Sequence, residues 1–318
     1  LHLCDRRQRQ MCIRDRVTVI GSINMDTTLR LTNMPKPGET MHAHEIFHAG
    51  GGKGANQAVA AKRSGARTSF IGGVGADSEG QQLLDLLTKE NIDTSGIAEI
   101  QGATTGQAMI MVDAAGENSI LIHAGANNAF HEQEVLKNKQ LITNSDFIIA
   151  QFESSLDATI LAFSIAKDAG KTTILNPAPA RETIPTELLE KTDIIIPNET
   201  ETEIITGIRV TDHNSLVAAA EKMHELGIGT VIITLGSVGA FYHTKKEHGI
   251  VPAFKVDAVD TTAAGDTFIG ALSSTLQPDL GNLKEAILYG NLASSIAVQS
   301  YGAQPSIPYR EALEQSAV

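Results

Sequence analysis

Residues 261–270 place small side chains, a glycine and one carboxylate directly before an apolar run that suits a helix. The first turn of a helix leaves backbone N–H groups without partners, and these groups together with the helix dipole favour a bound anion. Asp266 would then lie beside a phosphoryl group and take the proton from an incoming hydroxyl. The alternative is an aspartate near a helix N-terminus with a purely structural role. The segment alone is compatible with both interpretations.

A second glycine-rich segment, residues 50–56, also leads into a predicted helix. It matches neither the G-x-x-x-x-G-K-[ST] pattern of a P-loop nor the G-x-G-x-x-G pattern of a dinucleotide site. A tight turn explains one glycine, but three consecutive glycines exceed that need. The segment therefore favours contact between its backbone and a small ligand, with Lys53 and Asn56 as donors on the first helical turn.

Polar residues follow two predicted strands at the end where open α/β sheets bind ligands. Asn24 and Asp26 come after the first strand and point the same way because strand side chains alternate, and Glu153 follows a later strand. A carboxylate accepts two hydrogen bonds and an amide both donates and accepts, so the pair suits neighbouring hydroxyls. An Asx turn at the strand end is the structural alternative.

Two further segments leave predicted strands through polar residues or glycines. In the first, Asn198 and Glu201 either face phosphates and a hydrated Mg²⁺ or only cap a helix whose dipole suits acidic residues. In the second, Thr234 is followed by Gly236 and Gly239, a pattern that suits a nucleotide contact or a hairpin bend.

The composition is that of an acidic globular protein, with 318 residues, 42% hydrophobic, 19% charged and a formal net charge of −12. This charge argues against a nucleic-acid partner, which needs a basic surface. No apolar run has the length of a membrane span, so we expect no membrane association. An anionic nucleotide must therefore be held by local backbone dipoles and a cation.

Residues 1–16 are arginine-rich, lack the apolar centre of a signal peptide and contain both cysteines, Cys4 and Cys12. We expect this segment to be a non-native or disordered tail, with native structure beginning at Val17. The body of the chain has no cysteine and hence no disulfide framework, which suits a reducing cytoplasm.

From residue 67 onward, apolar strands alternate with helical stretches. The strands are predicted at residues 68–71, 147–151, 173–176, 193–197 and 230–234, and the helices at 78–90, 156–169, 215–226 and 283–298. This alternation predicts an α/β fold with an open, mostly parallel central sheet and helices on both faces. Short strands at 27–31 and 40–47 predict a small β appendage, and hairpins are expected within 107–123 and 239–254. No linker divides residues 17–318, which form one predicted domain.

The motifs at residues 21–26, 51–58, 197–201 and 260–268 resemble those of the ribokinase-like carbohydrate kinase family, in the family's order. The resemblance covers residues 17–318 and implies an ATP-dependent sugar kinase. The acceptor that it favours is D-ribose, phosphorylated at its 5-hydroxyl in the cytoplasm. Another pentose, 2-deoxyribose or a nucleoside remains an alternative acceptor, and a non-catalytic sugar or nucleotide sensor is the alternative outside enzymes.

The resemblance also implies a role for each matching residue. Asp266 would be the base, and the N–H groups of Ala264 and Gly265 would hold the γ-phosphate. The sugar would contact Asn24, Asp26, Gly52, Lys53, Asn56, Glu153 and Asp266. ATP would contact Asn198, Thr234, Gly236, Ser237, Gly239, Gly265 and Asn291.

Two metal ions are implied in the same way. Glu201 would act on Mg²⁺ through water. An activating K⁺ would be bound by Asp260, Thr262, Ala297, Ser300, Gly302 and Ser306. The strand pair at 27–31 and 40–47 would form a lid over the sugar, through which two copies of the chain would associate as a homodimer.

Overall fold

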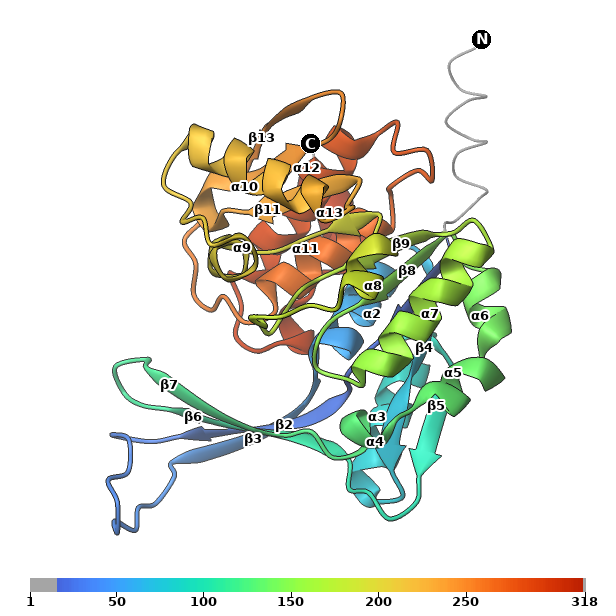
Figure 1. Ribbon diagram of the computed structural model, residues 1–318. Coiled ribbons are helices and arrows are strands. Elements are labelled where there is room, and N and C mark those ends of the chain that lie inside the picture. The colour runs from blue at the N-terminus through green and yellow to red at the C-terminus, as the bar shows by residue number, and fades with distance from the viewer. Residues whose placement is uncertain (1–15, 317–318) are drawn as a thin grey trace.

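The computed structural model describes residues 16–316 and is built around a nine-stranded sheet (Figure 1). The predicted tail lies outside the described residues, except for Arg16, which begins the first strand. The spatial order is β13 (His248–Pro252), β12 (Gly239–His243), β11 (Thr230–Thr234), β10 (Ile194–Ile195), β9 (Thr172–Leu175), β8 (Phe147–Ala150), β1 (Arg16–Ile20), β4 (Arg67–Gly75) and β5 (Asp93–Ile100). Neighbouring strands from β11 to β5 are parallel, whereas β12 is antiparallel to both β11 and β13. The predicted sheet is confirmed.

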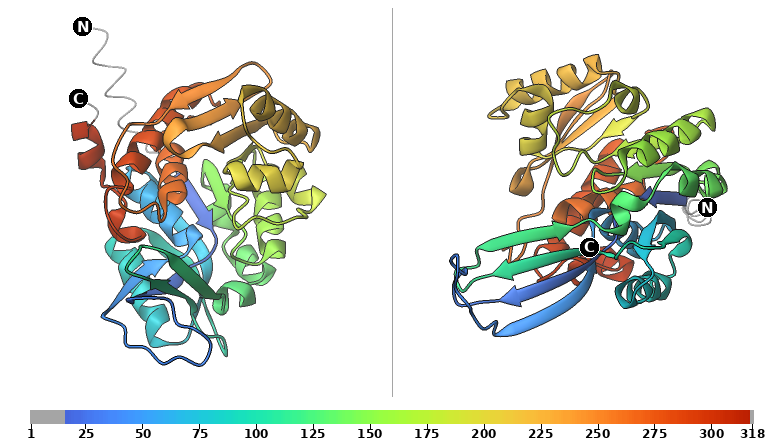
Figure 2. Two further views of the ribbon diagram at one scale, coloured as in Figure 1. Left: turned by 90° about the vertical axis from the view of Figure 1, so that its left-hand side faces the viewer. Right: turned by 60° about the horizontal axis from the view of Figure 1, so that its bottom comes forward.

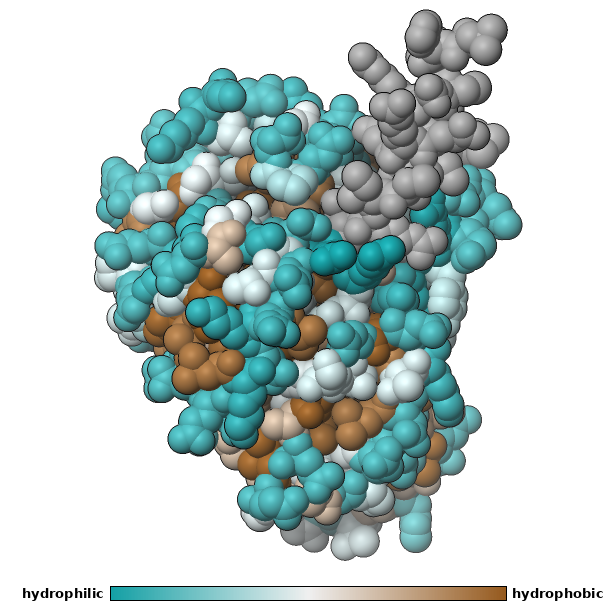
Figure 3. All heavy atoms as spheres, turned by 90° about the vertical axis from the view of Figure 1, so that its right-hand side faces the viewer, coloured by the Kyte–Doolittle hydropathy of each residue, from teal (hydrophilic) through white to brown (hydrophobic). Residues whose placement is uncertain are grey.

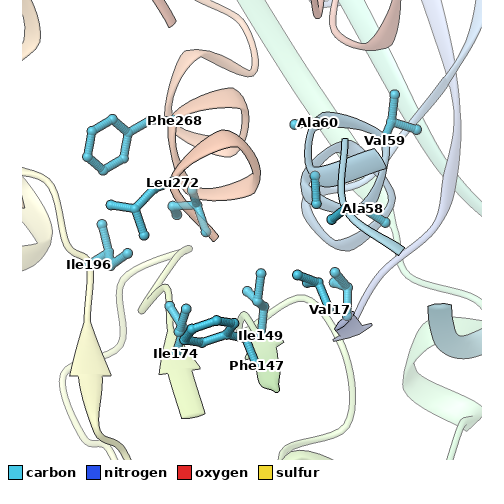
Figure 4. Close-up of a cluster of buried hydrophobic side chains, with 14 of the residues drawn as sticks. Val17, Ala58, Val59, Ala60, Phe147, Ile149, Ile174, Ile196, Phe268 and Leu272 are labelled. Atoms are coloured by element: carbon cyan, nitrogen blue, oxygen red, sulfur yellow. The ribbon is translucent and has the colours of Figure 1, made fainter. Parts of the chain in front are cut away.

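Strand residues alternate between two apolar cores, one on each face of the sheet. In β1, Val17 and Val19 face the first core and Ile20 faces the second. Because helices cover both faces, successive strand positions are apolar. The first core, part of which Figure 4 shows, packs against α2 (Lys53–Arg63), α3 (Ser78–Lys89), α11 (Ala264–Ser273) and α12 (Leu283–Ala297). The second packs against α5 (Glu132–Lys137), α6 (Lys139–Thr143), α7 (Leu156–Asp168), α8 (Thr186–Glu190) and α10 (His213–Glu225).

A separate four-stranded sheet, called the lid here, projects from the body of the molecule (Figures 1 and 2). Its order is β3 (Glu45–Gly51), β2 (Asn24–Arg30), β6 (Gly106–Val112) and β7 (Asn118–His123). The two central strands are parallel and each outer strand is antiparallel to its neighbour.

The structure corrects the predicted lid strands at 27–31 and 40–47. The β2–β3 ladder pairs Asn24 with Gly51 and Arg30 with Glu45. Strand β2 therefore begins three residues earlier than expected, beside the glycine segment. Strand β3 begins five residues later than expected and ends within the glycine segment. The predicted hairpin within 107–123 is the other half of the lid, because β6 pairs with β2. Strand β5, which was not predicted, forms the edge of the main sheet.

The remaining helices are short and lie at the ends of strands or at the end of the chain. They are α4 (Ala126–Ala129), α9 (Glu199–Thr206), α13 (Arg310–Ser316) and the 3₁₀ turns η1 (Gly236–Val238) and η2 (Gln304–Ser306). Within residues 16–316, no helix has the length and apolar character needed to cross a membrane. The face drawn in Figure 3 is largely hydrophilic, with smaller groups of apolar side chains between the hydrophilic ones.

Candidate functional site

Asp266 lies in the first turn of α11 and its side chain is buried, with 6% of the residue exposed. The chain enters this helix through Ala263 in the left-handed conformation, with φ of 58°. The N–H groups of Gly265 and Asp266 have no carbonyl one turn earlier within the helix, since the first intrahelical bond runs from Thr267 to Ala263. The predicted helix start beside a carboxylate is therefore present.

Two amides from α2 bind the two oxygens of this carboxylate. Asn56 Nδ2 donates to Asp266 Oδ2 at 3.2 Å, and Gln57 Nε2 donates to Asp266 Oδ1 at 2.8 Å. The helices approach closely because α11 carries Gly270, where a Cβ would lie 2.5 Å from the Ala60 Cβ. The structure thus brings Asn56 to the predicted base, and it adds Gln57, which was not predicted as a site residue.

A pocket of about 190 Å³ opens beside Asp266. Its lining includes residues predicted for catalysis, for sugar binding, and for nucleotide or Mg²⁺ binding. These are the catalytic segment 264–266, Lys53 for the sugar, and Asn198, Thr234 and Glu201 for the nucleotide and Mg²⁺. A larger cavity of about 390 Å³ lies elsewhere, between β5 and α5, and none of the predicted residues lines it. The convergence of the predicted residues therefore marks the smaller pocket as the candidate active site.

Two of the residues predicted to contact the sugar carry buried hydrogen-bond acceptors that have no donor. Among the described residues, Asp26 Oδ1 and Asn56 Oδ1 are buried and have no hydrogen-bond partner. Burial, followed by the nearby charges of Glu153 and Asp266, raises the pKa of Asp26 to about 7. Buried polar atoms are ordinarily satisfied, so these two oxygens indicate a ligand that supplies hydrogen-bond donors.

Glu153 ties the end of the sheet to the start of α2. Its Oε2 accepts hydrogen bonds from Ser22 Oγ at 2.6 Å and from the Lys53 N–H at 3.0 Å. The Lys53 side chain is surrounded by negative charge, and the charge of Asp266 above all raises its pKa against the opposing effect of burial, with Glu153 and Glu201 adding to the rise. One cation therefore lies among three carboxylates.

The glycine segment also has structural reasons for its composition. Gly52 has φ of 87°, and a Cβ there would lie 2.9 Å from the Ser22 carbonyl oxygen. A Cβ at Gly51 would collide with the carboxylate of Asp26, and one at Gly50 would lie 2.5 Å from Gln304 Oε1. Each of the three glycines thus leaves space for a neighbouring group, and the neighbour of Gly51 is Asp26, which is predicted to bind the sugar.

Asn24 is oriented by Asn127 of α4, a residue that the sequence did not reveal. Asn127 Nδ2 donates to Asn24 Oδ1 at 2.8 Å, while Asn127 Oδ1 accepts from the Ile23 N–H at 2.9 Å. Because Asn24 Oδ1 accepts from Asn127, the Nδ2 group of Asn24 is the part of its amide that is left to bind a ligand.

The predicted nucleotide residues divide into two groups. Asn198 and Glu201 form a capping box at the start of α9, with Asn198 Oδ1 accepting from the Glu201 N–H at 2.8 Å and Glu201 Oε2 accepting from the Asn198 N–H at 2.8 Å. Both also line the pocket, so their role as a helix cap does not remove them from the candidate site. Burial raises the pKa of Glu201. The lining of that pocket does not include Gly236, Ser237, Gly239 and Asn291.

Asn291 has a structural contact in this fold. Its Nδ2 donates to the carbonyls of Val251 at 3.0 Å and Pro252 at 3.1 Å, which ties α12 to β13. The glycine at 239 is required sterically, with φ of 121° and a Cβ that would lie 2.7 Å from the Ala253 nitrogen.

Three of the predicted K⁺ residues are joined by one carboxylate. Asp260 Oδ1 accepts from the Thr262 N–H at 2.9 Å, and Asp260 Oδ2 accepts from the Gly302 N–H at 2.8 Å. Burial acts to raise the pKa of Asp260, but the hydrogen bonds from Thr262 and Gly302 hold it below its usual range. Ala297 and Ser300 are linked by a backbone hydrogen bond of 3.1 Å. Ser306 lies in η2, where its hydroxyl donates to the carbonyl of Ala303.

Comparison with known proteins places this geometry among relatives. The chain is 47% identical over 302 residues to a ribokinase from Staphylococcus aureus (strain COL), covering 95% of this chain and 99% of the relative. It is 34% identical over 292 residues to a deoxyribokinase from Salmonella typhi, covering 92% and 95%. The structure of Arabidopsis thaliana ribokinase complexed with ribose and ATP is similar with a TM-score of 0.89 at 31% identity, over 95% of this chain and 98% of that chain. The family model for the pfkB family carbohydrate kinases matches residues 14–310, and the chain belongs to this family.

Proposed function

We propose that the protein transfers the γ-phosphoryl group of ATP to the 5-hydroxyl of D-ribose, giving D-ribose 5-phosphate and ADP in the cytoplasm, where ATP is supplied. The observation that carries the proposal is the pair of buried acceptors, Asp26 Oδ1 and Asn56 Oδ1, close to the base Asp266. A sugar rich in hydroxyls supplies the missing donors. The similarity to ribokinases, one of them complexed with ribose and ATP, supports the same acceptor.

In the proposed mechanism, Asp266 accepts the proton of the sugar hydroxyl as its oxygen attacks the γ-phosphorus and ADP leaves. The N–H group of Gly265 stabilises the negative charge on the transferred group, aided by the dipole of α11, and the N–H group of Ala264 joins it once its 3.2 Å hydrogen bond to the Thr261 carbonyl opens. Phosphoryl transfer depends mainly on alignment and charge stabilisation, and the helix start and the buried carboxylate supply both.

The residues present also fit the two proposed metal ions. Within residues 16–316, no group of three or more His, Cys, Asp or Glu side chains is arranged to hold a metal ion. Mg²⁺ would therefore be held chiefly by the nucleotide phosphates, with Glu201 acting through water. The Asp260 carboxylate joins two loops whose carbonyls would bind K⁺, together with those of Ala297, Ser300 and Ser306, and K⁺ would stiffen the approach to α11.

ATP-dependent phosphorylation across a panel of sugars tests the proposal. The panel contains D-ribose, 2-deoxyribose, other pentoses, a hexose and a nucleoside, each with and without K⁺. We expect the highest kcat/KM for D-ribose and activation by K⁺. A preference for 2-deoxyribose would reassign the acceptor. Turnover with none of the sugars would support a non-catalytic sensor instead.

Ribose affinity is expected to increase between pH 5.5 and 7 and to level off above pH 7. The pKa of about 7 means that Asp26 holds a proton below this pH, whereas an ionised carboxylate accepts two hydroxyl donors. Below pH 7 the dissociation constant should rise by up to about tenfold per pH unit, and binding should release a proton. Calorimetry in buffers of different ionisation enthalpy measures both quantities. Asp26→Asn should bind more weakly and lose the pH dependence, whereas a pH-independent wild type would contradict the expectation.

The same pKa gives a stability effect in the unliganded protein. The folded state holds the Asp26 proton up to about pH 7, while the unfolded chain releases it in the usual acidic range. Between these values the folded state binds more protons, so the free energy of unfolding contributed by this group falls as pH rises and is constant above about pH 7.

We propose that two copies of the chain associate through their lids. Large apolar side chains are exposed on three lid strands: Ile46, Phe47, Met109, Ile120, Leu121 and Ile122. Leu121 is the most exposed of them, at 65%. Leu121→Asp should convert a dimer into a monomer, which light scattering after gel filtration measures. An unchanged mass for the variant, or a monomeric wild type, would exclude this interface.

A further inference from the structure

A chain of buried amides leads from the sheet to Asp266. Gln151 Nε2 donates to Gln57 Oε1 at 2.6 Å. Gln57 Nε2 in turn donates to Asn176 Oδ1 at 3.1 Å and to Asp266 Oδ1 at 2.8 Å. Asn176 Nδ2 ends the chain by donating to the Ile196 carbonyl at 3.0 Å. These contacts link α2, the ends of two strands and the first turn of α11.

The orientations of Asn176 and Gln57 are fixed by groups that only accept. The Ile196 carbonyl requires the NH₂ group of Asn176, which turns Asn176 Oδ1 toward Gln57. The Asp266 carboxylate independently requires an NH₂ group from Gln57. Both demands select the same orientation of Gln57, so its oxygen must face Gln151.

Gln57 is fully buried, with 0% of the residue exposed, on a helix whose other buried positions are mostly alanine and valine. A buried amide is costly unless its hydrogen bonds are made. Here both hydrogens of Nε2 and the oxygen Oε1 are engaged. The side chain is therefore held in one position, and it holds one oxygen of Asp266 in turn.

We propose that Gln57 is a positioning residue for phosphoryl transfer: it fixes the carboxylate of Asp266 so that its other oxygen, Oδ2, is presented to the sugar hydroxyl. This inference rests on the proposed role of Asp266 as the base. Asn56 Nδ2 also approaches Oδ2, but at the longer distance of 3.2 Å. Rotation of the carboxylate would break the shorter of the two hydrogen bonds, from Gln57 Nε2 to Asp266 Oδ1. Gln57 does not line the pocket, so it acts only through Asp266.

Gln57→Leu tests the proposal because leucine has a volume similar to that of glutamine but lacks its hydrogen-bond donors. We expect kcat to fall by about 10- to 100-fold, since a displacement of about 1 Å in a reacting group has effects of this size, while the KM for ribose changes less than about threefold. Gln57→Glu is the second variant, in case the leucine variant does not fold. It keeps the shape and replaces the donor by an oxygen, and we expect a loss of kcat at least as large.

Thr18→Val is the matched control for a lost buried hydrogen bond. Thr18 is fully buried in the middle of β1, its hydroxyl pairs with Ser145 Oγ at 2.6 Å, and it does not line the pocket beside Asp266. This variant should lower the melting temperature and leave kcat unchanged. A fall in kcat as large as that of Gln57→Leu would show that reduced stability alone explains the loss.

A double-mutant cycle with Asp266→Asn separates positioning from a structural role. If Gln57 acts through the base, Gln57→Leu should change the residual kcat of Asp266→Asn less than about twofold, because no base remains to orient. Additive losses in kcat, or a wild-type kcat in folded Gln57→Leu, would overturn the inference. A wild-type kcat in Asp266→Asn alone would instead overturn the proposed function, so the two failures are distinguishable.

Discussion

Asp266→Asn is expected to lower kcat by about 10²- to 10⁴-fold, the range for loss of a general base, while ribose still binds. Asparagine keeps the shape of the side chain, but its Nδ2 cannot accept the hydroxyl proton. It would also place one NH₂ group against a donor, Asn56 Nδ2 or Gln57 Nε2. Steady-state kinetics measures kcat, and calorimetry measures ribose binding. A variant that keeps more than about one tenth of the wild-type kcat would exclude Asp266 as the base.

The control for Asp266→Asn is the ionisation of its neighbour. The charge of Asp266 contributes to the raised pKa of Asp26. Removing that charge should move the onset of tight ribose binding to lower pH. Binding that simply disappears at every pH would mean that the substitution had disrupted the sugar site, and the kinetic result would then carry no information on the base.

Gly265→Val is expected to lower kcat/KM for ATP by at least about 100-fold without unfolding the protein. A Cβ at Gly265 would meet no atom within 4 Å, so the fold itself tolerates a side chain there. The added methyl groups would instead extend into the pocket that Gly265 lines and displace the γ-phosphate from the N–H groups of the helix start. Losing a donor of this kind costs about 10²- to 10³-fold in rate. Kinetics with varied ATP, together with thermal unfolding, checks both parts.

Gly270→Ala on the same helix is the matched control. Its Cβ would lie 2.5 Å from the Ala60 Cβ and 2.5 Å from the Gln57 carbonyl oxygen, so α2 and α11 would have to separate. We expect this variant to lose about 1–3 kcal/mol of stability, the usual cost of overpacking. Should Gly265→Val destabilise the protein as much as Gly270→Ala, its kinetic defect could not be assigned to the phosphate site.

The main sheet could be predicted because its strands are short apolar runs between helical stretches, a local signal. Thr230–Thr234 was predicted with the bounds that the structure shows. Strand β5, with the sequence DTSGIAEI, was missed because it contains a glycine and carries a mostly polar, partly exposed surface. The four-stranded lid was only half predicted, since the pairing of β2 with β6 joins residues about eighty positions apart and has no local signature.

Within the candidate site, the sequence revealed residues in polar or glycine-rich motifs and missed those in apolar surroundings. Gln57 follows Asn56 where the glycine-rich motif passes into the apolar part of α2, and Gln151 follows an apolar strand. Neither carries a pattern that indicates a link to Asp266. Asn127 lies in a single helical turn more than 100 residues from its partner Asn24. An amide among the alanine and valine positions of α2 is the signal that could have pointed to Gln57, but its partners required the tertiary structure.

The negative charges around Lys53 have a consequence for the order of events after the reaction. In the proposed site, Asp26, Glu153 and Asp266 would face a sugar that enters without charge and leaves carrying a phosphate. The same carboxylates that grip a neutral substrate by its hydroxyls repel its dianionic product, and a single lysine cannot offset all of them. Product release from the sugar side is therefore favoured as soon as the phosphoryl group has moved across, and rebinding of the sugar phosphate is disfavoured. The acidic cavity would therefore weaken inhibition by the sugar phosphate, while the equilibrium of the reaction stays unchanged.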